Sequence, residues 1–334
     1  MEIKSLYQRL WSYHDTKELP QEKVLLDLSD EVVTVLENED PLYRPLTKDG
    51  RRGGLLDFTK ESKVVIIVPD IHARRDFLLK LISHSIRGVS ILRLLHEEKI
   101  TIICAGDAIH SETMPDARER WIKAYDDYIN GIPDGLYMRK EMSDSLYTLM
   151  IIMELKKAFP HSFHFLKGNH ENITNSSLNG DYPFKKFAEE GAMVKDFITK
   201  YYSDALLHVI DCYEKSLPLV CIFDKFAVSH AEPLTAFKKD MIINCHMYPG
   251  VIEGLTWTKN GDAFEGSVPL TFANLNPDYD KNKALWFAGH RTVSGTYEMR
   301  QGGQFIQFHN PDLMNVILLG RDRKFDPSKN IIGV

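Results

Sequence analysis

Five short apolar segments of this chain each end in polar residues of the kind that bind metal ions. They are 66–72 (IIVPDIH), 102–110 (IICAGDAIH), 164–171 (HFLKGNHE), 226–230 (FAVSH) and 285–290 (LWFAGH). Apolar, β-branched runs of this length are typical of strands that are buried on both faces of a sheet. Because ligands of α/β sheets bind beyond the carboxyl ends of the strands, we expect the five segments to converge on one rim.

The apolar spacing around these segments predicts an α/β fold. Residues 64–68 and 100–104 are expected to be strands joined by a helix, which makes a β-α-β unit. Residues 1–62 are polar with apolar residues at helical spacing, so they are expected to form a helical N-terminal extension on a main domain, 63–334. Residues 113–160 look largely helical and are long for a crossover, which indicates an inserted cap. The last third of the chain reads as short strands and turns.

Composition excludes several classes of protein. The chain has 334 residues, of which 43% are hydrophobic and 26% charged, as in an ordinary globular protein. Its net charge of −6 gives no overall basic field for nucleic acid. The four cysteines form no CxxC pair, the N-terminus does not resemble a signal peptide, and no apolar run is long enough for a bilayer. We therefore expect a cytoplasmic protein without a membrane or nucleic-acid partner.

The residue types at the strand ends suit a pair of divalent ions. Asp107 has two carboxylate oxygens with which it can bridge two metals, and Asn169 offers a neutral carbonyl oxygen. Mixed carboxylate and imidazole ligands suit Mn, Fe or Zn better than Ca. One strand-end histidine alone is more often structural, but five such segments together predict a two-metal site. The expected ligands are Asp70, His72, Asp107, Asn169, His230 and His290.

The order of the motifs DxH, GD, GNHE, SH and GH resembles that of the calcineurin-like metallophosphoesterases. Within that superfamily the chain looks most similar to the phosphoprotein phosphatase (serine/threonine phosphatase) branch, in segments 217–233 (LPLVCIFDKFAVSHAEP) and 254–259 (GLTWTK). The resemblance covers roughly residues 62–320. It implies a central β-sandwich flanked by helices, with the site at the top edge, and makes 63–334 the catalytic domain.

The resemblance also implies a role for each residue. Asp70 and His72 would bind the first metal, Asp107 would bridge, and the other three ligands would complete the second site. A metal-bridging hydroxide would attack phosphorus, and His170 would be the general acid that protonates the leaving oxygen. Two divalent ions, with Mn preferred and Fe or Zn as alternatives, would be the cofactors. The substrate would be a phosphorylated protein or small molecule.

The second motif departs from the family pattern GDxVDRG. His110 stands where an aspartate normally orients the catalytic histidine, so it is a candidate member of a catalytic dyad, with Glu112 or Asp76 as possible substitutes for that aspartate. Ser111 stands where an arginine normally grips the phosphate. The candidates to replace that arginine are Arg74, Arg75 and Arg291. Asn169 is a further candidate for contact with the substrate.

Three functions compete at this point. The resemblance favours hydrolysis of a phosphomonoester, and among phosphomonoesters it favours a phosphorylated side chain of a protein. The altered second motif and the expected cap favour instead a small substrate, such as a dinucleoside polyphosphate, a nucleotide or a phosphodiester. The altered motif also leaves open a metal-binding scaffold without activity.

Overall fold

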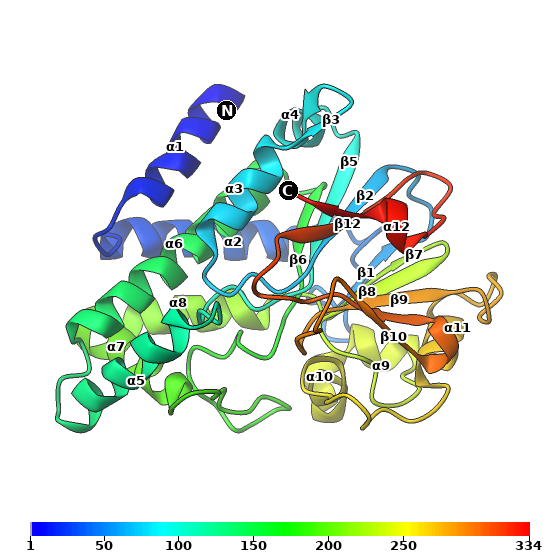
Figure 1. The fold of residues 1–334 in the computed structure, drawn as a ribbon. Helices are drawn as coiled ribbons and strands as arrows, with labels where there is room; N and C mark the ends of the chain where they lie inside the picture. The colour runs from blue at the N-terminus through cyan, green and yellow to red at the C-terminus, as the bar shows by residue number, and fades with distance from the viewer. Residues whose placement is uncertain (1) are drawn as a thin grey trace.

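Two β-sheets face each other at the centre of the molecule, in a computed structural model that describes residues 2–334 (Figure 1). The first sheet runs, in spatial order, β13 (Ile331–Gly333), β12 (Asn315–Leu319), β2 (Val64–Val68), β5 (Ile100–Cys104) and β6 (Phe163–Phe165). The second runs β1 (Leu55–Phe58), β7 (Val220–Phe223), β8 (Phe226–Ser229), β9 (Leu285–Ala288), β11 (Phe305–Gln307) and β10 (Glu298–Arg300). A small hairpin, β3 (Ser85–Ile86) and β4 (Val89–Ser90), lies apart from them.

Helices cover the outer faces of both sheets, as Figure 1 shows. One apolar cluster joins the five-stranded sheet to a layer of helices, some of which pack on the sheet and others on neighbouring helices. They are α1 (Ile3–Asp15), α2 (Glu22–Glu37), α3 (Arg75–Ser83), α4 (Ile91–His96), α5 (Asp116–Ile129), α6 (Leu136–Ala158), α7 (Glu190–Tyr201) and α8 (Asp204–Lys215). The six-stranded sheet packs on α9 (Lys239–Ile243), α10 (Pro249–Thr256) and α11 (Ser267–Leu275). A short α12 (Pro327–Asn330) precedes β13. Within residues 2–334, no helix has the length and apolar content needed to cross a membrane.

The apolar core has three parts that follow from the strand periodicity. Successive side chains of a strand point to opposite faces, so Val65 and Ile67 enter the layer between the sheets, whereas Ile66 and Val68 face the helices. The layer between the sheets also holds aromatic residues of the other sheet, such as Phe287. This arrangement confirms the predicted β-sandwich flanked by helices.

All five segments that were expected to be strands before polar residues are strands. β2 pairs in parallel with β5, β5 with β6, and β8 with β9. Their carboxyl ends therefore reach a common rim of the sandwich, where the polar residues that follow them come together.

The remaining segments differ from the sequence-based expectations in two respects. The expected helical extension, 1–62, contains β1, which pairs in parallel with β7 of the second sheet. The last third contains α10 and α11 as well as strands. The boundary at residue 62 stays a prediction, as does a cap at 113–160, where α5 and α6 pack on each other and on the helical layer.

Candidate metal centre

The loop after β2 carries Asp70 and His72 in a conformation that few residues adopt. His72 and Ala73 have positive φ values of 48° and 57°, a region that costs free energy for residues other than glycine. The loop is held in place by the backbone N–H groups of His72 and Ala73, which donate to the carbonyl oxygens of Asp107 and Ala108 at 2.8 and 2.9 Å. The side chains of Asp70 and His72 are both buried in this position.

Glu171 fixes the loop that carries Asp107. Its buried carboxylate accepts hydrogen bonds from the backbone N–H groups of Asp107, Ala108 and Gly168, at 2.9, 2.8 and 2.6 Å. Asp107 itself has a positive φ of 54° and accepts a hydrogen bond from the backbone N–H of His170 at 2.9 Å. Two strand ends, those of β5 and β6, are therefore tied together around one carboxylate.

The second group of expected ligands meets at one point. The Oδ1 atom of Asn169 lies 2.8 Å from Nε2 of His230 and 2.9 Å from Nδ1 of His290, and the two imidazole nitrogens are 3.2 Å apart. The other ring nitrogen of His230 lies 3.0 Å from the carbonyl oxygen of Ala105, which fixes the orientation of the ring. Three donor atoms from three strand ends thus point toward a common centre.

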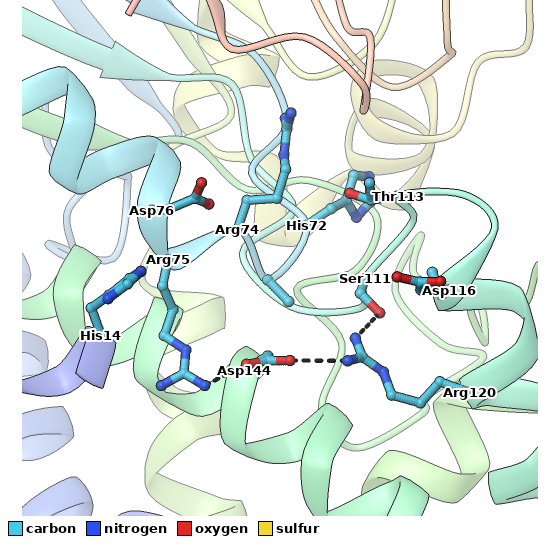
Figure 2. A pocket seen from close by; sticks show the side chains of 12 residues that line it. His14, His72, Arg74, Arg75, Asp76, Ser111, Thr113, Asp116, Arg120 and Asp144 are labelled. Carbon is cyan, nitrogen blue, oxygen red and sulfur yellow. Dashed lines mark hydrogen bonds and ion pairs between the residues drawn. The ribbon is translucent and has the colours of Figure 1, made fainter. Parts of the chain in front are cut away.

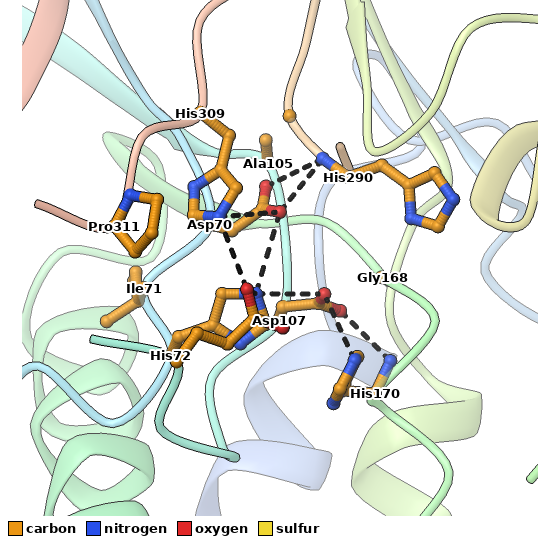
Figure 3. A network of polar contacts seen from close by, with 12 residues as sticks. Asp70, Ile71, His72, Ala105, Asp107, Gly168, His170, His290, His309 and Pro311 are labelled. Carbon is orange, nitrogen blue, oxygen red and sulfur yellow. Dashed lines mark hydrogen bonds and ion pairs between the residues drawn. The ribbon is translucent and has the colours of Figure 1, made fainter. Parts of the chain in front are cut away.

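Asp107 stands between the two groups, as the bridging role requires, and Figure 3 shows it near His72 and His170. Its Oδ2 atom lies 3.5 Å from Nε2 of His72 on one side and 3.5 Å from Nε2 of His230 on the other. Nε2 of His72 lies 3.8 Å from Oδ2 of Asp70. The structure therefore brings all six predicted ligands into one cluster.

The electrostatics of the cluster fit a pair of divalent ions. Burial raises the pKa of Asp107 well above its ordinary value, and the nearby Glu171 and Asp70 carboxylates raise it further. Burial conversely lowers the pKa of His72 to about 3. Neutral imidazoles beside crowded carboxylates are the donor set that divalent transition metals bind, and a cation would relieve the repulsion between the carboxylates.

His170 lies at the edge of the cluster beside His110. Nε2 of His170 is 3.8 Å from Oδ2 of Asp107, and its ring centroid is 4.6 Å from that of His110. Nδ1 of His170 has no hydrogen-bond partner among residues 2–334. Neither Glu112 nor Asp76, the two carboxylates suggested as its orienting partner, therefore holds it by a direct hydrogen bond. His110 is fully buried, with Nε2 3.5 Å from Oε1 of Glu190 and Nδ1 3.7 Å from Oε1 of Glu112.

The structure places the three candidate arginines in different surroundings. Arg74 is buried and donates to the carbonyl oxygens of Asp70, Ile71, Pro311 and Leu313, so it clamps the loop backbone. Arg75 donates to Asp144, which also accepts a hydrogen bond from Arg120. The Arg74 side chain points away from this group, as Figure 2 shows. Arg291, in contrast, lines a cavity of about 220 Å³ together with Asp107, Asn169, His170 and His290.

The same cavity shows which residues the sequence analysis missed. Lys186, which the sequence analysis did not single out, lines it, with Nζ 2.6 Å from Oε2 of Glu112. Trp257, in the segment 254–259 that carries part of the family resemblance, forms part of its wall. His309 lies at the cluster, with Nε2 3.9 Å from Oδ2 of Asp70. His309 carried a usable signal, because it follows the strand β11 just as the expected ligands follow theirs. Lys186 lies in a loop and carried none.

Comparison with known proteins finds a likeness of fold. No protein-family profile and no curated protein sequence matches the chain. A protein serine/threonine phosphatase from Saccharomyces cerevisiae, with similarity to human phosphatase PP5, matches with a TM-score of 0.54 and 16% identity, over 94% of this chain and 89% of that chain. A provisionally assigned diadenosine tetraphosphatase has a TM-score of 0.41 and 15% identity, over 84% and 97% of the two chains. A cold-active protein-tyrosine phosphatase of a psychrophilic Shewanella species has a TM-score of 0.38 and 13% identity, over 80% and 77%.

The first of these matches confirms the predicted fold. The chain has the metallophosphoesterase fold, in the form found in a serine/threonine phosphatase. The other two matches are weaker and carry no further argument about this chain.

Proposed function

We propose that this chain is a metal-dependent phosphatase that hydrolyses phosphomonoesters, with phosphorylated serine or threonine side chains of proteins as the substrate class. The observation that carries the proposal is the cluster of six side chains, five of them buried and His290 partly buried, arranged in two groups around the Asp107 carboxylate. Both groups meet at that carboxylate, since its Oδ2 atom lies 3.5 Å from Nε2 of His72 and 3.5 Å from Nε2 of His230.

Each group of donors would hold one divalent ion. Asp70 and His72 would hold the first, Asn169, His230 and His290 the second, and Asp107 both. Two bound ions would supply an activated water and neutralise the charge of the phosphoryl group. The mixture of carboxylate, amide and imidazole donors favours Mn, with Fe or Zn as alternatives.

His170 would give a proton to the leaving oxygen. Burial lowers its pKa well below the ordinary value, and the nearby His110 and His72 lower it further, so the free enzyme holds a neutral ring at pH 7. A phosphate dianion beside the ring favours the charged form of the imidazole. Substrate binding would therefore raise the pKa of the His170 ring, which would take up a proton from solvent and pass it to the departing alkoxide.

Lys186 and Arg291 would take the place of the missing phosphate-gripping arginine. Ser111 cannot do so, because its hydroxyl bonds to Glu141 and Arg120, away from the ligand cluster. Both cationic side chains line the cavity that the candidate ligands and His170 share. Its volume of about 220 Å³ lies below the range of about 300–1,000 Å³ that is usual for pockets of whole small molecules, which favours a phosphorylated side chain over a dinucleotide.

The test is hydrolysis by the full chain in the presence of Mn²⁺, with phosphoserine peptides, an aryl phosphate and a panel of nucleotides and dinucleoside polyphosphates. We expect turnover of the aryl phosphate and the peptides that is lost in His170→Asn and Asp107→Asn and kept in His161→Asn, which changes an exposed histidine. Faster turnover of nucleotides than of peptides would assign the chain to small substrates. Equal inactivity of the wild type and both variants with Mn, Fe and Zn would refute the proposed activity and leave a metal-binding scaffold.

A further inference from the structure

We infer that Glu112 and His309 are two additional ligands of the first metal position, so that five protein side chains surround that position. The inference rests on the proposed function, because it concerns one ion of the proposed pair. It goes beyond the ligand set that the strand-end motifs predict, which gives this position only Asp70, His72 and the bridging Asp107.

His309 is oriented as a ligand would be. It is fully buried in the loop after β11, and neither of its ring nitrogens has a hydrogen-bond partner among residues 2–334. Its Nε2 atom lies 3.9 Å from Oδ2 of Asp70 (Figure 3), and donor atoms of Asp70, His72 and His309 lie within 4.8 Å of one another. A buried imidazole without a partner costs free energy, and an ion shared with Asp70 would offset that cost.

Glu112 faces the same point from the opposite loop. It is 6% exposed, and its Oε2 atom lies 3.6 Å from Nε2 of His72 and 3.7 Å from Nε2 of His309. The same oxygen lies 2.6 Å from Nζ of Lys186. A carboxylate oxygen has two lone pairs, so it can bind an ion and accept a hydrogen bond from Lys186 at the same time.

The distances between the donors suit one shared ion. Donors that bind the same ion with bonds of about 2.1 Å lie about 3.0 Å apart at neighbouring corners of an octahedron and about 3.4 Å apart in a tetrahedron. Nε2 of His72 lies 3.5 to 3.8 Å from oxygens of Asp70, Asp107 and Glu112. If each of these distances shortened by about 0.5–0.8 Å, the four atoms would lie at neighbouring corners of one octahedral ion.

Five protein ligands would make the two metal positions unequal. The first position would be surrounded by three carboxylates and two imidazoles, with little room for a substrate oxygen. The second position would have one shared carboxylate, an amide and two imidazoles, and so would keep room for substrate. The extra negative charge of Glu112 would also lie beside Lys186, which lines the substrate cavity.

The experiment is calorimetric titration of metal-free full-length protein with Mn²⁺, for the wild type, His309→Phe and Glu112→Gln. We expect two ions per wild-type chain. Each variant should bind one of the two at least about tenfold more weakly, and the other within about threefold, since even indirect partners of metal ligands change affinity by about 10–100-fold. The exposed residues His96 and Glu265 supply matched controls, His96→Phe and Glu265→Gln, which should bind as the wild type does.

A Mn²⁺-loaded crystal structure of the wild type gives a second readout that does not depend on the folding of a variant. The inference predicts anomalous density for an ion bonded to Nε2 of His309 and to the Glu112 carboxylate. Unchanged affinities in both variants, or water molecules in both ligand places of the crystal, would overturn it. The proposed function would still stand after that result if the chain hydrolyses phosphoesters with Mn²⁺. Conversely, a crystal structure with all five ligands on the ion, from a chain that shows no hydrolysis, would refute the proposed function and leave the ligand assignment intact.

Discussion

Gly289, directly before the expected ligand His290, tests whether the position of the Asp70 carboxylate matters for hydrolysis. A Cβ atom at Gly289 would lie 1.7 Å from Oδ1 of Asp70, and the backbone there does not have a positive φ, so the effect of Gly289→Ala is steric alone. Non-bonded heavy atoms need about 3.5 Å between them, so the carboxylate oxygen must move away by about 1.8 Å. It would then lose the hydrogen bonds from the His290 N–H, at 2.8 and 3.1 Å.

A misplacement of about 1 Å can cost about 10²-fold in rate, and overpacking costs about 1–3 kcal/mol of folding free energy. We therefore expect Gly289→Ala to hydrolyse an aryl phosphate with Mn²⁺ at least about 100-fold more slowly and to unfold at lower urea concentration. Gly295→Ala is the matched control, because a Cβ at that nearby glycine meets no atom within 4 Å. Activity of Gly289→Ala within threefold of that of Gly295→Ala would refute the reasoning.

Three further substitutions separate catalysis, metal binding and folding. His170→Asn should lower kcat by about 10²–10⁴-fold, as the loss of a general acid does, while atomic emission still finds two ions; loss of an ion would contradict this role. Because the pKa of Asp107 is raised in the folded chain, its ionised form destabilises the metal-free protein above the ordinary carboxyl pKa of 3.8. Asp107→Asn should therefore raise the urea midpoint of metal-free protein at pH 7, a gain that disappears near pH 4; a loss at pH 7 would be contrary evidence. Arg74→Ala should lower the free energy of unfolding by about 2–4 kcal/mol, because buried carbonyl groups lose their charged hydrogen-bond donor. A higher KM with unchanged stability would instead show that Arg74 binds the substrate.

The five strands that precede the expected ligands, and the six donors themselves, could be predicted because their signals are local. Runs such as 64–68 and 100–104 are long enough and apolar enough to be read as buried strands, and each ligand follows its strand directly. The helices α10 and α11 were not predicted, because they are short and the second apolar core holds them in place.

The parts of the site that are assembled from loops could not be predicted in the same way. Arg74 follows a ligand closely, but its side chain reaches the backbone of the 311–313 loop. Lys186 and Glu112 are far apart in sequence and meet only because loops after different strands cross the same rim. Proximity to a ligand in the sequence therefore did not indicate that Arg291 and Lys186, and not Arg74 or Arg75, line the cavity beside the ligand cluster.

The most direct test of the central claim is the number of divalent ions that the full chain binds. Metal-free protein is mixed with Mn²⁺, freed of unbound ions by gel filtration and measured by atomic emission, beside Asp107→Asn. Two ions per wild-type chain and fewer than one in the variant, which removes the shared carboxylate, are the predicted results. A wild-type chain that retains no Mn, Fe or Zn, or a variant that retains two ions, would contradict a dinuclear centre bridged by Asp107.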